Sequence, residues 1–80
     1  MVTLVKEEIA KIVLSEFNNG QKKFVILGNN SMADVIELAL KGFEYKRVKD
    51  PGEINDHNAL VLIAEKSLSA NGNRAINMAS

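Results

Sequence analysis

Two short runs of apolar residues constrain the fold of this chain more than any other feature of its sequence. The first run lies within KFVILG at 23–28, and the second is ALVLIA at 59–64. Apolar runs of this length, bounded by turn residues, are typical of strands that are covered on both faces, as in a parallel sheet. The sequence therefore predicts two buried strands that lie side by side.

An amphipathic helix is expected before the first strand, over residues 3–18. Apolar side chains recur there at helical spacing, and they are Val2, Val5, Ile9, Ile12 and Val13. Thr3 is a suitable N-cap. The Asn-Asn-Gly segment at 18–20 predicts the end of the helix, because Gly20 can adopt the left-handed conformation.

A second helix is expected over residues 32–41, directly after the first buried strand. Ser31 is a suitable N-cap, and Asp34 three residues later completes a capping-box pattern. Most of the other side chains in this segment are apolar, so we expect a largely buried helix that ends at Gly42.

The rest of the chain predicts a further strand, a turn and a variable tail. FEYKRVK at 43–49 reads as a short strand whose charges suit a sheet edge, and DPG at 50–52 is a turn signal. Only about ten residues separate this strand from the run at 59–64, so the third strand pairs either parallel or antiparallel. Residues from about 70 to 80 are expected to form a short helix or a frayed tail.

The expected fold is a single small α/β domain over residues 1–80. A β-α-β core makes a three-stranded, mainly parallel sheet, and helices, including the N-terminal amphipathic one, pack on it. The chain has no cysteine, and 46% of its residues are hydrophobic. Its stability therefore depends on a modest apolar core, which favours help from a partner or from self-association.

Neither a membrane span nor export is expected. No segment approaches the length of about 18 apolar residues that a spanning helix requires. The MVTLVKEEIAK start has acidic residues where a secretory signal has an apolar core. The sequence favours a soluble, cytoplasmic protein.

The turn between the first strand and the second helix is a candidate anion-binding site. It consists of Gly28, Asn29, Asn30 and Ser31. Backbone N–H groups at a helix start attract anions, and a glycine lets a ligand come close. The turn lacks the three glycines of the dinucleotide fingerprint and the Gly-Lys-Ser/Thr of the phosphate loop. A plain strand-to-helix connection is therefore the alternative interpretation.

Five basic residues form a candidate nucleic-acid-binding surface. They are Lys22, Lys23, Lys46, Arg47 and Lys49. The formal net charge is zero, from ten basic and ten acidic side chains, which argues against a dedicated polyanion binder. Only Tyr45 lies among them to stack on bases. Protection of a sheet edge and ordinary solvation are the alternative interpretation.

No catalytic group, metal site or cofactor is expected. The chain has no cysteine, and no serine lies in a Gly-x-Ser-x-Gly turn. His57 is the single histidine, whereas a metal site needs three or four convergent ligands. The sequence therefore predicts a protein that is not an enzyme.

The middle of the chain, residues 24–68, resembles the small stalk protein called the F subunit in archaeal and vacuolar-type rotary ATPases. The likeness comprises a strand ending in glycine (FVILG), a helix, the segment YKRVKDPGEI, and an apolar strand running into polar residues (ALVLIAEKSL). It implies a similar small α/β sheet. The chain lacks the later strand and the long C-terminal helix that such stalk proteins use to enter the rotor.

A second resemblance is to the Alba family of archaeal chromatin and RNA-binding proteins. FVILGNNSMADVIELAL is similar to the opening strand and helix of that family, and NGNRAINMA is similar to its loop and second helix start. This resemblance implies nucleic-acid binding through Lys22, Lys23 and Arg74.

Taken together, the sequence favours a non-enzymatic protein-interaction or regulatory module that docks on a protein partner or on itself. Apolar residues on a second side of the first helix suggest a homodimer contact, and they are Leu4, Ala10 and Leu14. Nucleic-acid binding, and binding of a small anion or nucleotide at Gly28–Ser31, are the alternatives.

Overall fold

The structure is a computed structural model that describes residues 5–70 and 72–79. Its elements are α1 (Lys6–Asn18), β1 (Lys23–Leu27), α2 (Ser31–Ala39), β2 (Glu44–Val48), the 3₁₀ turn η1 (Pro51–Glu53), β3 (Leu60–Ile63) and β4 (Ala75–Asn77). The strands form one sheet in the order β2-β1-β3-β4, and every neighbouring pair is parallel. The predicted α/β fold with a parallel sheet is confirmed, although the described sheet has four strands and not three.

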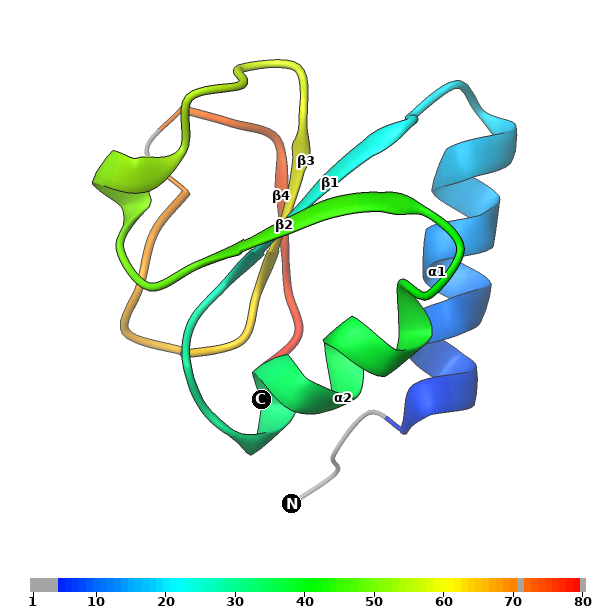
Figure 1. Ribbon diagram of the computed structural model, residues 1–80, viewed down its shortest axis with the longest axis horizontal. Coiled ribbons are helices and arrows are strands. Elements are labelled where there is room, and N and C mark those ends of the chain that lie inside the picture. The colour runs from blue at the N-terminus through cyan, green and yellow to red at the C-terminus, as the bar shows by residue number, and fades with distance from the viewer. Residues whose placement is uncertain (1–4, 71, 80) are drawn as a thin grey trace.

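The two faces of the sheet are covered differently (Figure 1). Helices α1 and α2 lie on one face, called here the helix face. The segments 49–59 and 65–70 pass over the other, called here the loop face. Alternate residues of β1 and β3 supply the two cores: Phe24, Ile26, Leu60 and Leu62 on the helix face, and Val25, Leu27, Val61 and Ile63 on the loop face.

The direction of the third strand is parallel. Phe24 of β1 lies opposite Leu60 of β3, and the register continues to Leu27 opposite Ile63. The connection 49–59 crosses the loop face with η1 as its only described helical turn. It crosses β1 without a regular helix, which explains how so short a connection joins two parallel strands.

Strand β2 lies at the edge of the sheet, as predicted. Its residues alternate between the two faces. Tyr45 packs against the core of the helix face, and Val48 belongs to the core of the loop face. Arg47 therefore points toward α2, whereas Lys46 points to the loop side.

The prediction of a short helix or frayed tail over about residues 70–80 is wrong for the part that the structure describes. Ala75–Asn77 form β4, which pairs with β3 so that Ile76 lies opposite Leu62. Ile76 packs against the core of the helix face, and Met78 is buried in it. Burial of these two side chains on the open edge of β3 outweighs the weak local preference of so short a segment.

Helix α1 is described from Lys6 onward, with Ile9 and Val13 fully buried. The helix begins later than the predicted residue 3, because Val5 is extended and forms its N-cap without a side-chain hydrogen bond. Thr3, Val2 and Leu4 lie outside the described residues. No helix in the described part of the chain is long and apolar enough to cross a membrane.

Candidate functional site

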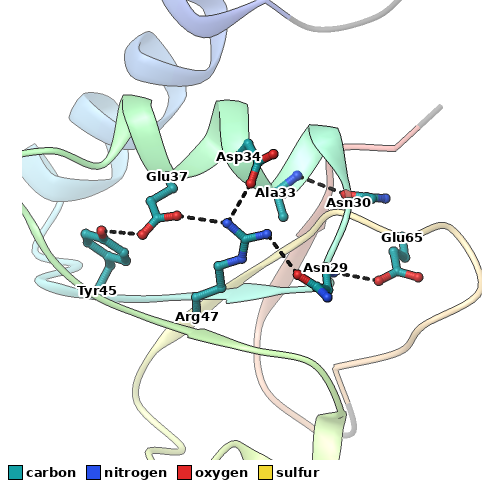
Figure 2. A network of polar contacts seen from close by, with 8 residues as sticks. All are labelled: Asn29, Asn30, Ala33, Asp34, Glu37, Tyr45, Arg47 and Glu65. Atoms are coloured by element: carbon teal, nitrogen blue, oxygen red, sulfur yellow. Dashed lines mark hydrogen bonds and ion pairs between the residues drawn. The ribbon is translucent and has the colours of Figure 1, made fainter.

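A group of polar residues extends along α2 and β2 to the carboxyl ends of β1 and β3 and is called here the carboxyl-end cluster (Figure 2). Its members are Asn29, Asn30, Asp34, Glu37, Tyr45, Arg47 and Glu65. The sheet order places β1 between β2 and β3. The connection after β1 leads to β2 on one side of β1, and the connection after β2 leads to β3 on the other side of β1. The strand order therefore reverses between β1 and β3, which is where open α/β sheets usually bind ligands.

Gly28 forms the tight exit from β1 at this point. Its φ angle is +138°, which residues other than glycine rarely adopt. A Cβ atom built on Gly28 would lie 3.0 Å from the Ala64 Cβ and 3.2 Å from a Glu65 carboxylate oxygen. The turn after β1 thus packs directly under the residues that follow β3, and a side chain at position 28 would force Ala64 and Glu65 to move.

Two further hydrogen bonds tie the turn to the end of β3. The backbone N–H of Asn29 donates to the Glu65 Oε2 at 2.7 Å. The side-chain amide of Asn30 donates to the Ala64 carbonyl at 3.0 Å. A carboxylate of the protein itself therefore occupies the position beside the Asn29 N–H group.

Asn30, and not Ser31, is the N-cap of α2. Its Oδ1 accepts the Ala33 N–H at 2.9 Å, as Figure 2 shows. The predicted capping box of Ser31 and Asp34 is therefore wrong, because asparagine caps as well as serine and lies one residue earlier. Asp34 instead forms an ion pair with Arg47, and the Ser31 side chain is exposed.

Arg47 connects α2 to β2. Its Nη1 lies 2.8 Å from an oxygen of Asp34 and 2.8 Å from an oxygen of Glu37, and its Nη2 donates to the Asn29 Oδ1 at 3.2 Å. The Tyr45 hydroxyl donates to the other Glu37 oxygen at 2.8 Å. These contacts hold the helix against the edge strand and reach the turn after β1.

The same contacts shift the pKa values of the cluster. The Tyr45 hydroxyl first, and then the Arg47 guanidinium, lower the pKa of Glu37. The Glu37 carboxylate in turn raises the pKa of Tyr45. Hydrogen bonds to Asp34 and Glu37 raise the pKa of Arg47. At neutral pH Arg47 and Glu37 are therefore both charged.

Two backbone donors at the start of α2 remain without an acceptor in the described part of the chain. The first four N–H groups of a helix have no partner within it. Ala33 donates to the Asn30 side chain and Asp34 donates to the Asn30 carbonyl. The N–H groups of Ser31 and Met32 are left, and both belong to the first turn of α2.

The structure separates the six suggested basic residues into different parts of the surface. Lys22, Lys23 and Arg74 lie at the amino ends of the strands, whereas Lys46, Arg47 and Lys49 lie on β2 or directly after it. Arg47 and Lys46 point to opposite faces of the sheet. No single basic surface includes them all.

The basic residues near the end of α1 have partners inside the protein. Lys22 lies over the Phe17 ring, with its nitrogen 3.7 Å from the ring centroid. Arg74 forms an ion pair with Glu16 and donates to the Gln21 side chain at 3.2 Å. The hydrogen bond from Arg74 lowers the pKa of Glu16. Arg74 therefore joins β4 to α1.

Lys23 forms an ion pair with Asp56 at 3.3 Å. The pKa of Asp56 is lowered first by a backbone N–H bond within its own turn and then by Lys23. The pKa of Glu53 is lowered by the backbone N–H groups of the turn that it caps, and further by the charges of Lys46 and Lys49. Among residues 5–70 and 72–79, no three acidic or histidine side chains cluster in a way that suits a metal ion.

The sequence did not identify Glu65 or the contacts of Arg47. An acidic residue directly after a buried strand is a signal that could have drawn attention to Glu65, because the carboxyl ends of parallel strands share one edge. The pairing of Arg47 with α2 depends on the register of β2, and the sequence does not show that register.

No model of a known protein family matches this chain, and no curated protein or solved structure matches it either.

Proposed function

We propose that the protein binds a small ligand with a phosphate or similar anionic group, such as a nucleotide, at the Gly28–Ser31 turn. The observation that carries this proposal is the position of the turn. It lies at the carboxyl end of β1, between β1 and β3, where the strand order reverses. Parallel α/β sheets usually bind their ligands at this point, with anionic groups at the start of the following helix.

The donors at the turn support an anionic group. The N–H groups of Ser31 and Met32 have no acceptor among the described residues, and the Asn29 N–H already binds a carboxylate oxygen at 2.7 Å. A phosphate oxygen that replaces the Glu65 oxygen would meet the same donor. The partial positive charge of the α2 start adds to the attraction.

Carboxylates near the turn oppose the binding of an anionic ligand. Asp34, Glu37 and Glu65 carry three carboxylates, and Arg47 is the one cation in the cluster. Repulsion from Glu65 weakens phosphate binding unless its side chain moves away from Asn29. A displaced Glu65 would then be an acceptor for hydroxyl groups of the ligand, which fits a sugar phosphate or nucleotide better than a bare anion.

Titration followed by ¹H–¹⁵N spectra tests this proposal. Inorganic phosphate and AMP are added to the protein and to the Glu65→Gln variant, which retains size but loses the competing charge. We expect saturable shifts at the amides of Asn29, Ser31 and Met32, at lower ligand concentration in Glu65→Gln. Unchanged amide signals in both proteins at millimolar ligand would contradict the proposal.

A second proposal is a non-enzymatic interaction module, supported by apolar side chains on the helix layer. Leu14 of α1 and Leu38 of α2 are each 51% exposed. Single exposed leucines are common, so this proposal requires that both side chains contact the same partner. If that contact exists, Leu38→Lys abolishes stoichiometric co-purification of a partner, and Lys41→Glu just after the same helix does not.

Nucleic-acid binding through the basic residues stays a prediction, tested by the salt dependence of affinity.

A further inference from the structure

The two edges of the sheet differ in charge. The β2 edge has charged side chains at Glu44, Lys46 and Arg47, and charges of this kind discourage pairing with another strand. The β4 edge, Ala75–Asn77, has none, and the segment AINMA at 75–79 is uncharged throughout. The second edge therefore lacks the protection that the first one has.

Hydrogen-bond directions show which backbone groups of β4 have no partner among the residues that the structure describes. The Arg74 carbonyl accepts the Val61 N–H at 3.0 Å, and the Met78 N–H donates to the Ile63 carbonyl at 2.8 Å. Successive residues of a strand direct their N–H and C=O groups to opposite sides. Ile76 therefore faces β3 as well, and the backbone groups of Ala75 and Asn77 face away from β3 along the open edge.

We propose that a second copy of this chain pairs with that edge, with the two β4 strands antiparallel about a twofold axis at Ile76. In this register Ala75 of each copy lies opposite Asn77 of the other, and the two residues exchange their N–H···O bonds. The sheets of the two copies then form one continuous sheet. This site lies apart from the Gly28–Ser31 turn and does not depend on the proposed ligand.

The side chains of β4 are compatible with a second copy in this register. Ala75 and Asn77 are small or uncharged and lie exposed on the loop side, so they meet without like charges. Ile76 lies on the helix side and is half-buried. The twofold axis places two Ile76 side chains directly opposite each other, in the closer, non-hydrogen-bonded type of pair. The neighbouring Arg74 is paired with Glu16, so no uncompensated cations approach.

The proposed pairing is short, so the dimer should be weak. Three residues of β4 make a much smaller interface than a permanent dimer requires. We therefore expect a monomer–dimer equilibrium that shifts toward the dimer as the protein concentration rises.

Two charge variants test the register. Ala75→Lys with Asn77→Lys places lysine opposite lysine, and Ala75→Lys with Asn77→Glu places lysine opposite glutamate. Both leave Ile76 and the hydrogen bonds to β3 in place. Sedimentation velocity at near-millimolar concentration should show the dimer for the wild-type chain and the Lys/Glu variant, and its loss in the Lys/Lys variant.

Every other result overturns the proposal. A wild-type chain that stays monomeric at that concentration excludes pairing with a second copy. This holds also if an unrelated extended peptide binds the edge instead. A dimer that persists in the Lys/Lys variant places the contact elsewhere, and loss in both variants excludes this register. As a second readout, amide exchange at Ala75 and Asn77 should slow several-fold as the protein concentration rises. Rates that do not depend on concentration also refute the pairing.

Discussion

The helix face and the loop face of the sheet share the same strands but are held by different means. On the helix face, α1 and α2 pack over Phe24, Ile26, Leu60 and Leu62, and side-chain bonds from Asn30 and Arg47 fix α2 in place. On the loop face, irregular segments cover Val25, Leu27, Val61 and Ile63. A parallel sheet can therefore bury both faces when only one of them has helices.

The largest effects should come from matched leucine truncations on the two faces. Leu62 and Leu27 are both fully buried, in the helix-face and loop-face cores respectively. We expect Leu62→Ala to reduce the free energy of unfolding by about 4 kcal/mol and Leu27→Ala by about 2 kcal/mol, because loops collapse around a cavity more readily than packed helices. Urea denaturation measures both; equal losses would show that the loop face is as rigid as the helix face.

Gly28→Ala should cause the next largest loss of stability, because Gly28 lies where the turn after β1 contacts the residues that follow β3. We expect a loss of about 1–3 kcal/mol from the left-handed backbone, with close contacts to Ala64 and Glu65 in addition. Gly42→Ala is the matched control, because Gly42 has φ +93° but no atom within 4 Å of the place where a Cβ would lie. If the two variants lose equal stability, the contact between the turn and residues 64–65 is unimportant.

Asn30 caps α2 and also bonds to the end of β3, and two substitutions separate these roles. Asn30→Ala removes the cap of α2 and the bond to the Ala64 carbonyl, and should cost about 1–2 kcal/mol. Asn30→Ser retains a capping oxygen but loses the bond to Ala64, so a smaller loss is expected. Thermal or urea unfolding gives both values. A serine variant as unstable as the alanine variant would mean that the link to the loop side dominates.

The smallest effect concerns the pH dependence of stability on the helix face. The pKa of Glu37 in the folded protein lies below its ordinary value of 4.5. Glu37 therefore stabilises the fold above pH 4.5, and this contribution is lost as the pH falls through the lower, folded value. Tyr45→Phe removes the main cause of the shift, so the variant should lose less stability between neutral pH and about pH 3.

The control for this prediction is Glu44→Gln, which removes an exposed carboxylate from the same strand. This variant retains the hydrogen bond between Tyr45 and Glu37, so the pH dependence that this bond causes should persist in it. If Tyr45→Phe and the wild-type chain lose stability in parallel on acidification, the hydroxyl bond to Glu37 does not contribute in solution.

The apolar runs at 24–27 and 59–64 predicted the central strands because their side chains are buried on both faces, and burial of that kind leaves a clear sequence signal. Strand β4 was missed for the opposite reason. Its three residues are too few to show a period, and Ile76 is held by contacts with distant residues.

The candidate site was predictable only in part. The glycine turn before a helix marked Gly28–Ser31, but Ser31 and Asn30 are equally good caps, so local pattern could not choose between them. Glu65 reaches the turn only because β1 and β3 are parallel neighbours. Likewise, Arg47 meets Asp34 and Glu37 because β2 packs beside α2, and the spacing along the chain does not encode that contact.

The central claim is that the turn after β1 is a ligand site whose anion position Glu65 now occupies. The most direct test compares phosphate titrations of Glu65→Gln and Glu44→Gln, which each remove one negative charge, at opposite ends of the sheet. We predict that the Asn29 amide of Glu65→Gln shifts at several-fold lower phosphate concentration than in Glu44→Gln. If the Asn29 amide responds alike in the two variants, or in neither, the claim is contradicted.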